Sequence, residues 1–190
     1  MFDSLMGFPV LSTPRLKLRK LKISDNKDIF ECTSDIKVTQ YELWQVHKNL
    51  NETNLFIQSV LCRYDNGVFN DWAIELNHSK KIIGMIGFTS VNKFESSAEV
   101  GFDLNSKYWN NGYMTEALNA ILTYGFNYMN LSKINAKTIA YNKRCMRVLE
   151  KCGFTYLERL INYIIMNGEN TDVLWYAKKA DCHNLHTSES

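Results

Sequence analysis

The clearest hydrophobic pattern in the chain lies within residues 96–126. Ala98, Val100 and Phe102 alternate with more polar positions, which is the two-residue period of a strand. From Met114 onward, apolar residues recur every three or four positions, which is typical of an amphipathic helix. The pattern therefore predicts a strand, a connection and a helix, in that order.

The connection, residues 109–114 (WNNGYM), has the composition of an anion-binding turn. Asn and Gly tolerate positive φ, so successive backbone N–H groups can point into one concavity. The helix begins at once, its first N–H groups have no intrahelical partners, and its aligned peptide dipoles make this end partly positive. These features predict a site for a phosphate-type anion. An ordinary strand-to-helix connection is the alternative, because a single glycine is a weak signal.

Hydrophobic periodicity also predicts the remaining elements. The other strands are expected over residues 13–19, 71–76, 82–91, 133–140, 154–166 and 171–179. Three further helices are expected after an N-cap at Ser24, after Asn51 up to a turn at residues 65–67, and over 142–152, with a loop or broken helix over 38–50. Gly153 suits the end of the third of these helices, and Asn167-Gly168 predicts a hairpin turn. The fold class is therefore α/β, an α+β mixed sheet of about seven strands flanked by about four helices.

Length and composition place the chain among folded proteins. It has 190 residues, of which 45% are hydrophobic and 13% aromatic, so we expect one domain over residues 1–180 and a frayed tail over 181–190. A net charge of +2 gives no general attraction to nucleic acid or to a membrane surface. No apolar run approaches the roughly 20 residues that cross a bilayer, and the first residues do not read as a secretory signal. We therefore expect a cytoplasmic protein without nucleic-acid or membrane partners.

The cysteines predict neither disulfides nor a metal site. There are five, an odd number, and none forms a C-x-x-C pair. A zinc site needs four closely spaced ligands, which this sequence does not offer. We expect free thiols in a reducing cytoplasm and no metal.

The connection at 109–114 resembles the acyl-CoA motif of the GNAT superfamily of N-acetyltransferases, (Q/R)-x-x-G-x-(G/A). Trp109 stands where Gln or Arg is usual, Gly112 matches, and Met114 replaces the small last residue. The longer run AEVGFDL…YWNNGYMTEAL is more similar to the RimJ/RimL-like branch, as is TPRLKLR near the start. The resemblance extends over roughly residues 10–180. It implies a mostly antiparallel GNAT sheet and acetyl-CoA as cosubstrate.

The resemblance also implies which backbone groups bind the cosubstrate. The pyrophosphate is expected on the connection and the first turn of the helix. The pantetheine amide and the developing oxyanion are expected on the end of the preceding strand. The residues are Trp109, Asn110, Asn111, Gly112, Tyr113, Met114 and Thr115 for the first group, and Phe102, Asp103 and Leu104 for the second.

A second block, residues 142–154, resembles the N-x-x-S-x-x-V-L-E-K-x-G-F segment of RimJ/RimL-like proteins. Asn142 matches the residue that contacts pantetheine, and Cys145 replaces a Ser near the CoA sulfur. From the residues alone, Asn142 is also a good helix N-cap and Cys145 a small core residue. Tyr141 competes with Cys145 for the role of general acid.

The helix of this block carries a basic side. Lys143, Arg144, Arg147 and Lys151 share it by their spacing. It is either a solvated surface or, for Arg144 and Arg147 above all, a contact for CoA phosphates. One short basic side without aromatic residues is a poor nucleic-acid footprint.

Glu99 is the candidate general base. It points away from the apolar side of its strand, and the E-(I/V)-G-(Y/F) element of similar enzymes places this carboxylate near the acceptor amine. Amine attack on a thioester needs a neutral amine, which a carboxylate can help to provide. The alternative is a cross-strand ion pair with Lys or Arg. Glu75 is a second, weaker candidate.

We therefore expect an enzyme that transfers acetyl from acetyl-CoA to a primary amine by direct attack. A protein N-terminal amine of the ribosomal-protein type is the leading acceptor, and a polyamine or aminoglycoside is the alternative. A non-catalytic acyl-CoA sensor of the same fold is the rival from another class. Tyr41, Trp44 and His47 either line the acceptor pocket or cover the core. The chain is expected to be a monomer or a homodimer.

Overall fold

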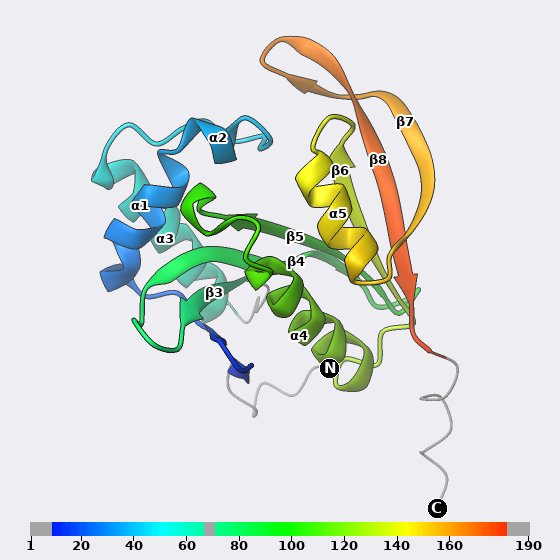
Figure 1. Cartoon of the computed structure of the whole chain (residues 1–190), viewed down its shortest axis with the longest axis horizontal. Helices are drawn as coiled ribbons and strands as arrows, with labels where there is room; N and C mark the ends of the chain where they lie inside the picture. Colours follow the sequence, from blue (N-terminus) through cyan, green and yellow to red (C-terminus); the bar gives the residue numbers. More distant parts are fainter. Residues whose placement is uncertain (1–8, 67–70, 182–190) are drawn as a thin grey trace, which may run out of the picture. The chain divides into compact units, whose positions relative to one another are not determined.

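The structure is a computed structural model that describes residues 9–66 and 71–181 (Figure 1). Its strands are β1 (Leu11–Ser12), β2 (Leu16–Arg19), β3 (Asp71–Leu76), β4 (Ile82–Asn92), β5 (Ser97–Leu104), β6 (Lys133–Ile139), β7 (Thr155–Met166) and β8 (Glu169–Lys179). Its α-helices are α1 (Asn26–Thr33), α2 (Ile36–Thr39), α3 (Leu50–Asp65), α4 (Tyr113–Asn127) and α5 (Lys143–Lys151), with short 3₁₀ turns η1 (Ile23–Asp25) and η2 (Ser106–Tyr108).

The eight strands form one sheet in the order β1-β2-β3-β4-β5-β6-β8-β7. β5 and β6 pair in parallel, whereas β1-β2, β2-β3, β3-β4, β6-β8 and β7-β8 are antiparallel. The predicted mixed, mostly antiparallel sheet with flanking helices is therefore confirmed. The count of about seven strands and four helices missed β1 and α2, which are only 2 and 4 residues long. Such short elements carry too few positions to show a period.

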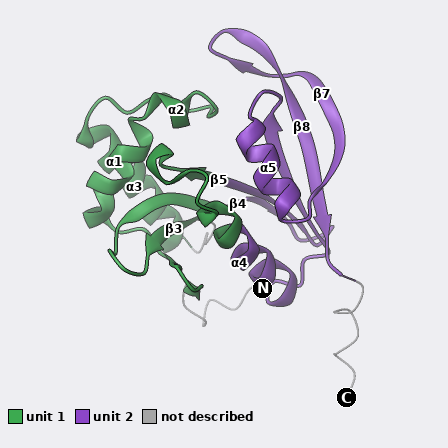
Figure 2. Ribbon diagram, in the orientation of Figure 1, with its two compact units in different colours: residues 1–87, 102–117 green, residues 88–101, 118–190 purple. Residues whose placement is uncertain are grey.

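The chain divides into two compact units, coloured separately in Figure 2. Unit 1 comprises residues 1–87 and 102–117, and unit 2 comprises 88–101 and 118–190. The expectation of one domain over 1–180 stays a prediction. Most of the expected frayed tail, residues 182–190, lies outside the described residues.

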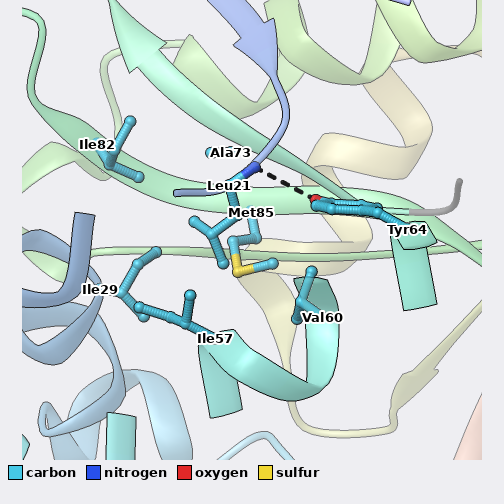
Figure 3. Packing of buried hydrophobic residues seen from close by; sticks show 8 residues of the cluster. All are labelled: Leu21, Ile29, Ile57, Val60, Tyr64, Ala73, Ile82 and Met85. Atoms are coloured by element: carbon cyan, nitrogen blue, oxygen red, sulfur yellow. Dashed lines mark hydrogen bonds between the residues drawn. The ribbon is translucent and has the colours of Figure 1, made fainter. Parts of the chain in front are cut away.

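Unit 1 packs α1 and α3 against its strands through a hydrophobic core (Figure 3). Ile57 and Val60 of α3 are fully buried, one turn apart on the same side of the helix. They meet Ile29 from α1 and Ala73 from β3. The Tyr64 ring closes this core, and its hydroxyl accepts a hydrogen bond from the Leu21 N–H at 3.3 Å.

A buried ion network fixes the start of α1 and corrects one prediction. The Arg19 guanidinium donates to Asp25 at 2.8 and 2.9 Å and also to Glu75. Asp25 in turn accepts from the Lys22 N–H at 2.8 Å, so it organises the turn that precedes the helix. The predicted N-cap, Ser24, lies inside η1 instead, because Asp25 with its buried partner decides where the helix begins. Glu75, the weaker candidate base, is committed to Arg19.

Two other helix starts differ from the predicted ones for local reasons. The region 38–50, predicted as a loop or broken helix, overlaps the end of α2, which Asp35 caps by accepting the Lys37 N–H. α3 begins at Leu50 rather than after Asn51, because Asn49 is the N-cap and accepts the N–H groups of Asn51 and Glu52. The predicted turn after α3 begins at the C-cap Asn66, and Gly67 lies outside the described residues.

Unit 2 packs the later part of α4 and α5 on its strands. Gly125 of α4 leaves no room for a side chain, since a Cβ would lie 2.8 Å from Ile134 and 3.1 Å from Phe88. Gly153 follows α5 with φ +80°, as predicted for a residue beyond a helix C-terminus. Asn167 and Gly168 both have positive φ, 52° and 83°, which confirms the tight turn between β7 and β8.

Candidate active site

The turn before α4 has the backbone that its sequence predicts. Asn110 (φ 62°) and Gly112 (φ 76°) are both left-handed, and they flank Asn111. The Asn111 amide folds back on the turn and donates to the Trp109 carbonyl at 2.9 Å. The Asn111 side chain therefore stabilises the turn by a hydrogen bond within it. The turn lies at the surface, where Asn110, Asn111 and Gly112 are exposed.

α4 follows this turn directly and presents its first N–H groups. The Glu116 N–H bonds to the Gly112 carbonyl at 3.0 Å, which closes the first helical turn. α4 begins at Tyr113, and the first N–H groups of a helix cannot all be bonded within the helix itself. The Met114 side chain is core, only 5% exposed, so this residue can offer a ligand only its backbone. Fixed amides and the positive end of a 15-residue helix thus suit an anion.

Arg15 and Glu116 brace this site, and the sequence analysis did not single out either. Arg15 Nε lies 2.6 Å from Glu116 Oε2, Arg15 Nη1 donates to the Asn111 carbonyl at 2.9 Å, and the guanidinium lies 4.5 Å from the Tyr113 ring centre. Thr13 Oγ1 donates to the other Glu116 oxygen at 2.6 Å. Burial alone would raise the pKa of Glu116, but the hydrogen bonds from Thr13 and Arg15 outweigh it and lower that pKa. No sequence pattern pairs positions 15 and 116.

The end of β5 is the second predicted backbone site, and β4 crosses it closely. A Cβ on Gly84 would lie 2.3 Å from the Asp103 carbonyl oxygen and 2.9 Å from the Leu104 Cα. The Leu104 carbonyl accepts the Trp109 indole N–H at 2.8 Å. Trp109, which replaces the usual Gln or Arg, therefore ties the turn to β5. This hydrogen bond links the turn to the strand segment that holds Phe102, Asp103 and Leu104, all within unit 1.

The β5–β6 ladder is shorter than either strand. Paired positions run from Ser97 with Lys133 to Val100 with Ala136. β5 continues to Leu104 and β6 to Ile139. Residues 102–104, whose backbone the resemblance expects to bind pantetheine, follow this paired part of β5.

A pair of acidic side chains in unit 1 was not predicted as a pair. The Cys32 thiol donates to Asp103 Oδ1 at 3.2 Å, and burial raises the pKa of Asp103 to about 6 against the hydrogen bonds from Cys32 and Met85. Burial, and then the charge of Asp103, raise the pKa of Glu42 to about 8, although a hydrogen bond with Trp44 opposes the shift. At neutral pH Asp103 is thus mainly ionised and Glu42 mainly protonated. Neither hydrophobic period nor motif reveals this coupling.

The loop before α3 holds the aromatic residues expected near the acceptor. The Trp44 ring lies 5.6 Å from the His47 ring, which lies 5.9 Å from Phe56 of α3. His47 Nδ1 lies 2.9 Å from the Thr53 hydroxyl, and burial lowers the pKa of His47. His47 thus packs against α3 and Trp44 packs on His47, while Tyr41, a few residues earlier, is half-buried.

In unit 2, α5 begins as the sequence predicts. The Asn142 side chain accepts the Cys145 N–H at 3.1 Å, which confirms Asn142 as the N-cap. Cys145 lies in the first turn, is half-buried and belongs to no disulfide. Tyr141 is 53% exposed, and its hydroxyl donates to the Met166 sulfur, a weak acceptor, at 3.3 Å. The basic residues Lys143, Arg144, Arg147 and Lys151 are all exposed.

Glu99 forms the cross-strand ion pair that was its alternative role. Lys137 Nζ lies 2.9 Å from Glu99 Oε2, and the two side chains are 27% and 29% exposed. Glu99 pairs with Asn135 in the β5–β6 ladder, so Lys137 stands two residues further along the same face of β6. The pairing does not exclude a role as base, because the carboxylate keeps a second oxygen.

The predicted site residues therefore fall into two groups. Unit 1 holds residues 102–104 and 109–115, and unit 2 holds Glu99, Tyr141, Asn142, Arg144, Cys145 and Arg147. Within the described ranges, no three His, Cys, Asp or Glu side chains are placed to hold a metal ion. Nor does any helix in the described part of the chain have the length and apolar character to span a bilayer.

Comparisons with known proteins agree with this geometry. The model of the family described as "Acetyltransferase (GNAT) domain" matches residues 15–155. The uncharacterized N-acetyltransferase YoaA of Bacillus subtilis is 32% identical over 170 residues, which cover 90% of this chain and 96% of YoaA.

Two solved structures show the same fold. RimL, a ribosomal alpha-N-protein acetyltransferase in complex with coenzyme A, superposes with a TM-score of 0.79 at 19% identity, over 91% of this chain and 99% of RimL. The spermidine N-acetyltransferase of Vibrio cholerae, in complex with CoA and spermine, gives 0.73 at 22% identity, over 88% and 96% of the two chains. With the family match over most of its length, this chain belongs to the GNAT family and is an acetyl-CoA-dependent N-acetyltransferase.

Proposed function

We propose that this enzyme acetylates a protein N-terminal amine of the ribosomal-protein type by direct transfer from acetyl-CoA. The observation that carries the cosubstrate site is the turn at residues 109–112 with its two left-handed residues, which leads directly into the N-terminus of α4. The fold likeness to RimL supports the acceptor.

In this proposal the turn and the start of α4 bind the pyrophosphate through backbone amides. Arg15 and Glu116 keep these amides in place, so their orientation costs little when the ligand arrives. Arg144 and Arg147 at the start of α5 add charge for further phosphate oxygens. Asn142 binds the pantetheine arm, as does the backbone of residues 102–104.

The chemical step then needs one base and one acid. The amine nitrogen attacks the thioester carbonyl carbon, so that a C–N bond forms as the C–S bond breaks. One proton passes from the amine to Glu99, directly or through a water. The CoA sulfur leaves as a thiolate and takes a proton from Cys145 or Tyr141. N–H groups at the end of β5 stabilise the oxyanion while it exists.

A small cationic amine such as a polyamine is the second candidate acceptor, and the acidic pair in unit 1 favours it. Glu42 holds a proton only because burial and the charge of Asp103 disfavour its ionised form. A cation placed beside the pair would remove both penalties and let the two carboxylates share its charge. Aromatic rings such as that of Trp44 also attract ammonium groups.

Replacing Gly112 tests the phosphate site. Gly112→Val places a β-branched side chain at φ 76°, which strains the turn and moves its amides. We expect the affinity for acetyl-CoA to fall by roughly 10-fold or more, measured by isothermal titration calorimetry. Gly168→Val is the matched control, because it imposes the same strain at φ 83° in the β7–β8 turn. Equal affinities in the two variants would contradict the assignment.

Replacing Glu99 tests the base. Glu99→Gln keeps the shape of the side chain and removes its proton acceptor, so kcat should fall roughly 100-fold while the acetyl-CoA Kd stays the same. Rates are measured in a screen that offers peptides beginning with Ala or Ser, and spermine, with Glu95→Gln as control. Full activity in Glu99→Gln would refute the role of Glu99, and turnover of spermine without any peptide would favour the second acceptor.

Replacing Glu42 tests the buried acidic pair through the pH dependence of stability. In the unfolded chain the pKa of a Glu side chain is about 4.3. Between that pH and about 8 the folded protein retains a proton that the unfolded chain has lost, so the free energy of unfolding falls as the pH rises.

Glu42→Gln removes this contribution. We expect the melting temperature of the variant, relative to wild type, to be higher at pH 8.5 than at pH 5.5 by about 5 °C. The control is Glu169→Gln at an exposed position of β8, and the difference between its melting temperature and that of wild type should be the same at both pH values. If the melting temperature of Glu42→Gln differs from that of wild type by the same amount at both pH values, Glu42 is ionised in the folded protein at neutral pH.

A further inference from the structure

Lys137 and Glu99 are part of a larger arrangement on one face of the unit 2 strands. Lys137 of β6 stands directly opposite Trp175 of β8, and Asn135 stands opposite Glu99 of β5. The Trp175 indole N–H donates to Asn135 Oδ1 at 3.3 Å. Ladder pairing and side-chain bonds thus tie the neighbours of Glu99 to one another across three strands.

Two aromatic rings hold the Lys137 ammonium in place. Its Nζ lies 5.4 Å from the centre of the Tyr163 ring, on β7, and 5.8 Å from that of Trp175. Both distances are within the range of cation–π attraction. Burial lowers the pKa of Lys137, but the hydrogen bond and charge of Glu99, with a smaller contribution from Tyr163, outweigh this and raise it. Lys137 therefore stays an ammonium at any pH at which the enzyme works.

The ammonium contacts only one oxygen of Glu99. Lys137 Nζ bonds to Oε2 at 2.9 Å, and Oε1 accepts no hydrogen bond from a side chain or backbone in the described part of the chain. Because lysine contacts a single carboxylate oxygen, the other oxygen stays available to a water or an amine. A bidentate arginine would occupy both oxygens.

We propose that Lys137 is the positioning residue of Glu99: its salt bridge to Oε2 orients the carboxylate and leaves Oε1 to receive the proton of the acceptor amine. The inference rests on the proposed role of Glu99 and extends it. Lys137 neither gains nor loses a proton during transfer, because the proton moves from the amine to Oε1. Tyr163 and Trp175 set the place of the ammonium and so the direction of the carboxylate.

The test compares Lys137→Met, Lys137→Arg and Lys133→Met. Lys133 lies on the same face of β6, four residues earlier, so its replacement removes an equal charge without touching Glu99. The acceptor is whichever peptide or polyamine the wild-type enzyme acetylates in the screen above. Thermal melting and the acetyl-CoA Kd report on folding and on the cosubstrate site.

For Lys137→Met we expect kcat to fall at least roughly 10-fold, with an unchanged acetyl-CoA Kd. The KM for the acceptor should stay near the wild-type value, because Lys137 orients the base without touching the amine. Lys137→Arg keeps the ion pair but can engage both oxygens of Glu99, so its kcat should fall as well. Lys133→Met should behave as wild type.

The outcomes separate the two claims. If Glu99→Gln is inactive while Lys137→Met keeps the wild-type kcat, the positioning role is wrong and the base stands. If Glu99→Gln is fully active, the proposed base is wrong. If Lys137→Met melts too low to assay, Lys137→Arg decides, since full activity in that folded variant would contradict the need for a free Oε1.

Discussion

The site depends on one constraint: the first N–H groups of a helix cannot all be bonded within the helix, so the turn that leads into α4 has to hold them in place. The chain meets this constraint with two left-handed residues, Asn110 and Gly112, and with side chains that return to the turn. Glu116 lies in the first turn of α4 and binds Arg15 and Thr13 near the start of the chain. The amides are therefore fixed before any ligand is present, which is what an efficient phosphate site requires.

The second half of the site follows from strand geometry. Successive side chains of a strand point to opposite faces of the sheet. Glu99 therefore points away from the apolar side of β5 and toward the face that carries Lys137. The same salt bridge can be read as ordinary cross-strand stabilisation or as orientation of a base. The free second oxygen and the aromatic support of Lys137 favour orientation. Partly exposed ion pairs contribute about 1 kcal/mol or less to stability, so stability alone is a weak reason for this arrangement.

Local patterns predicted most of the fold. Alternation and helical spacing located every long element, and Asn142, Gly153 and the Asn167-Gly168 turn were predicted from their backbone preferences. The errors arose where a distant partner decides a local feature. Asp25, held by Arg19, moved the start of α1 away from Ser24, and Arg19 is itself bound by Glu75 of β3 only once the sheet has formed.

The same reason limited the prediction of the site. The residues at 109–115 and Asn142 could be found because their role depends on local backbone geometry. Arg15, Lys137 and Glu42 could not, because each acquires its partner from a segment far along the chain. For Glu42 the missing information is burial, which an irregular loop sequence does not encode.

The central claim is that fixed amides at residues 109–115 bind the phosphates of acetyl-CoA, and a calorimetric comparison of acetyl-CoA with acetyl-pantetheine tests it most directly. Acetyl-pantetheine keeps the thioester and the arm but lacks every phosphate. The account predicts that acetyl-CoA binds at least about 100-fold more tightly, equivalent to roughly 2.7 kcal/mol. Equal affinities for the two compounds would contradict it.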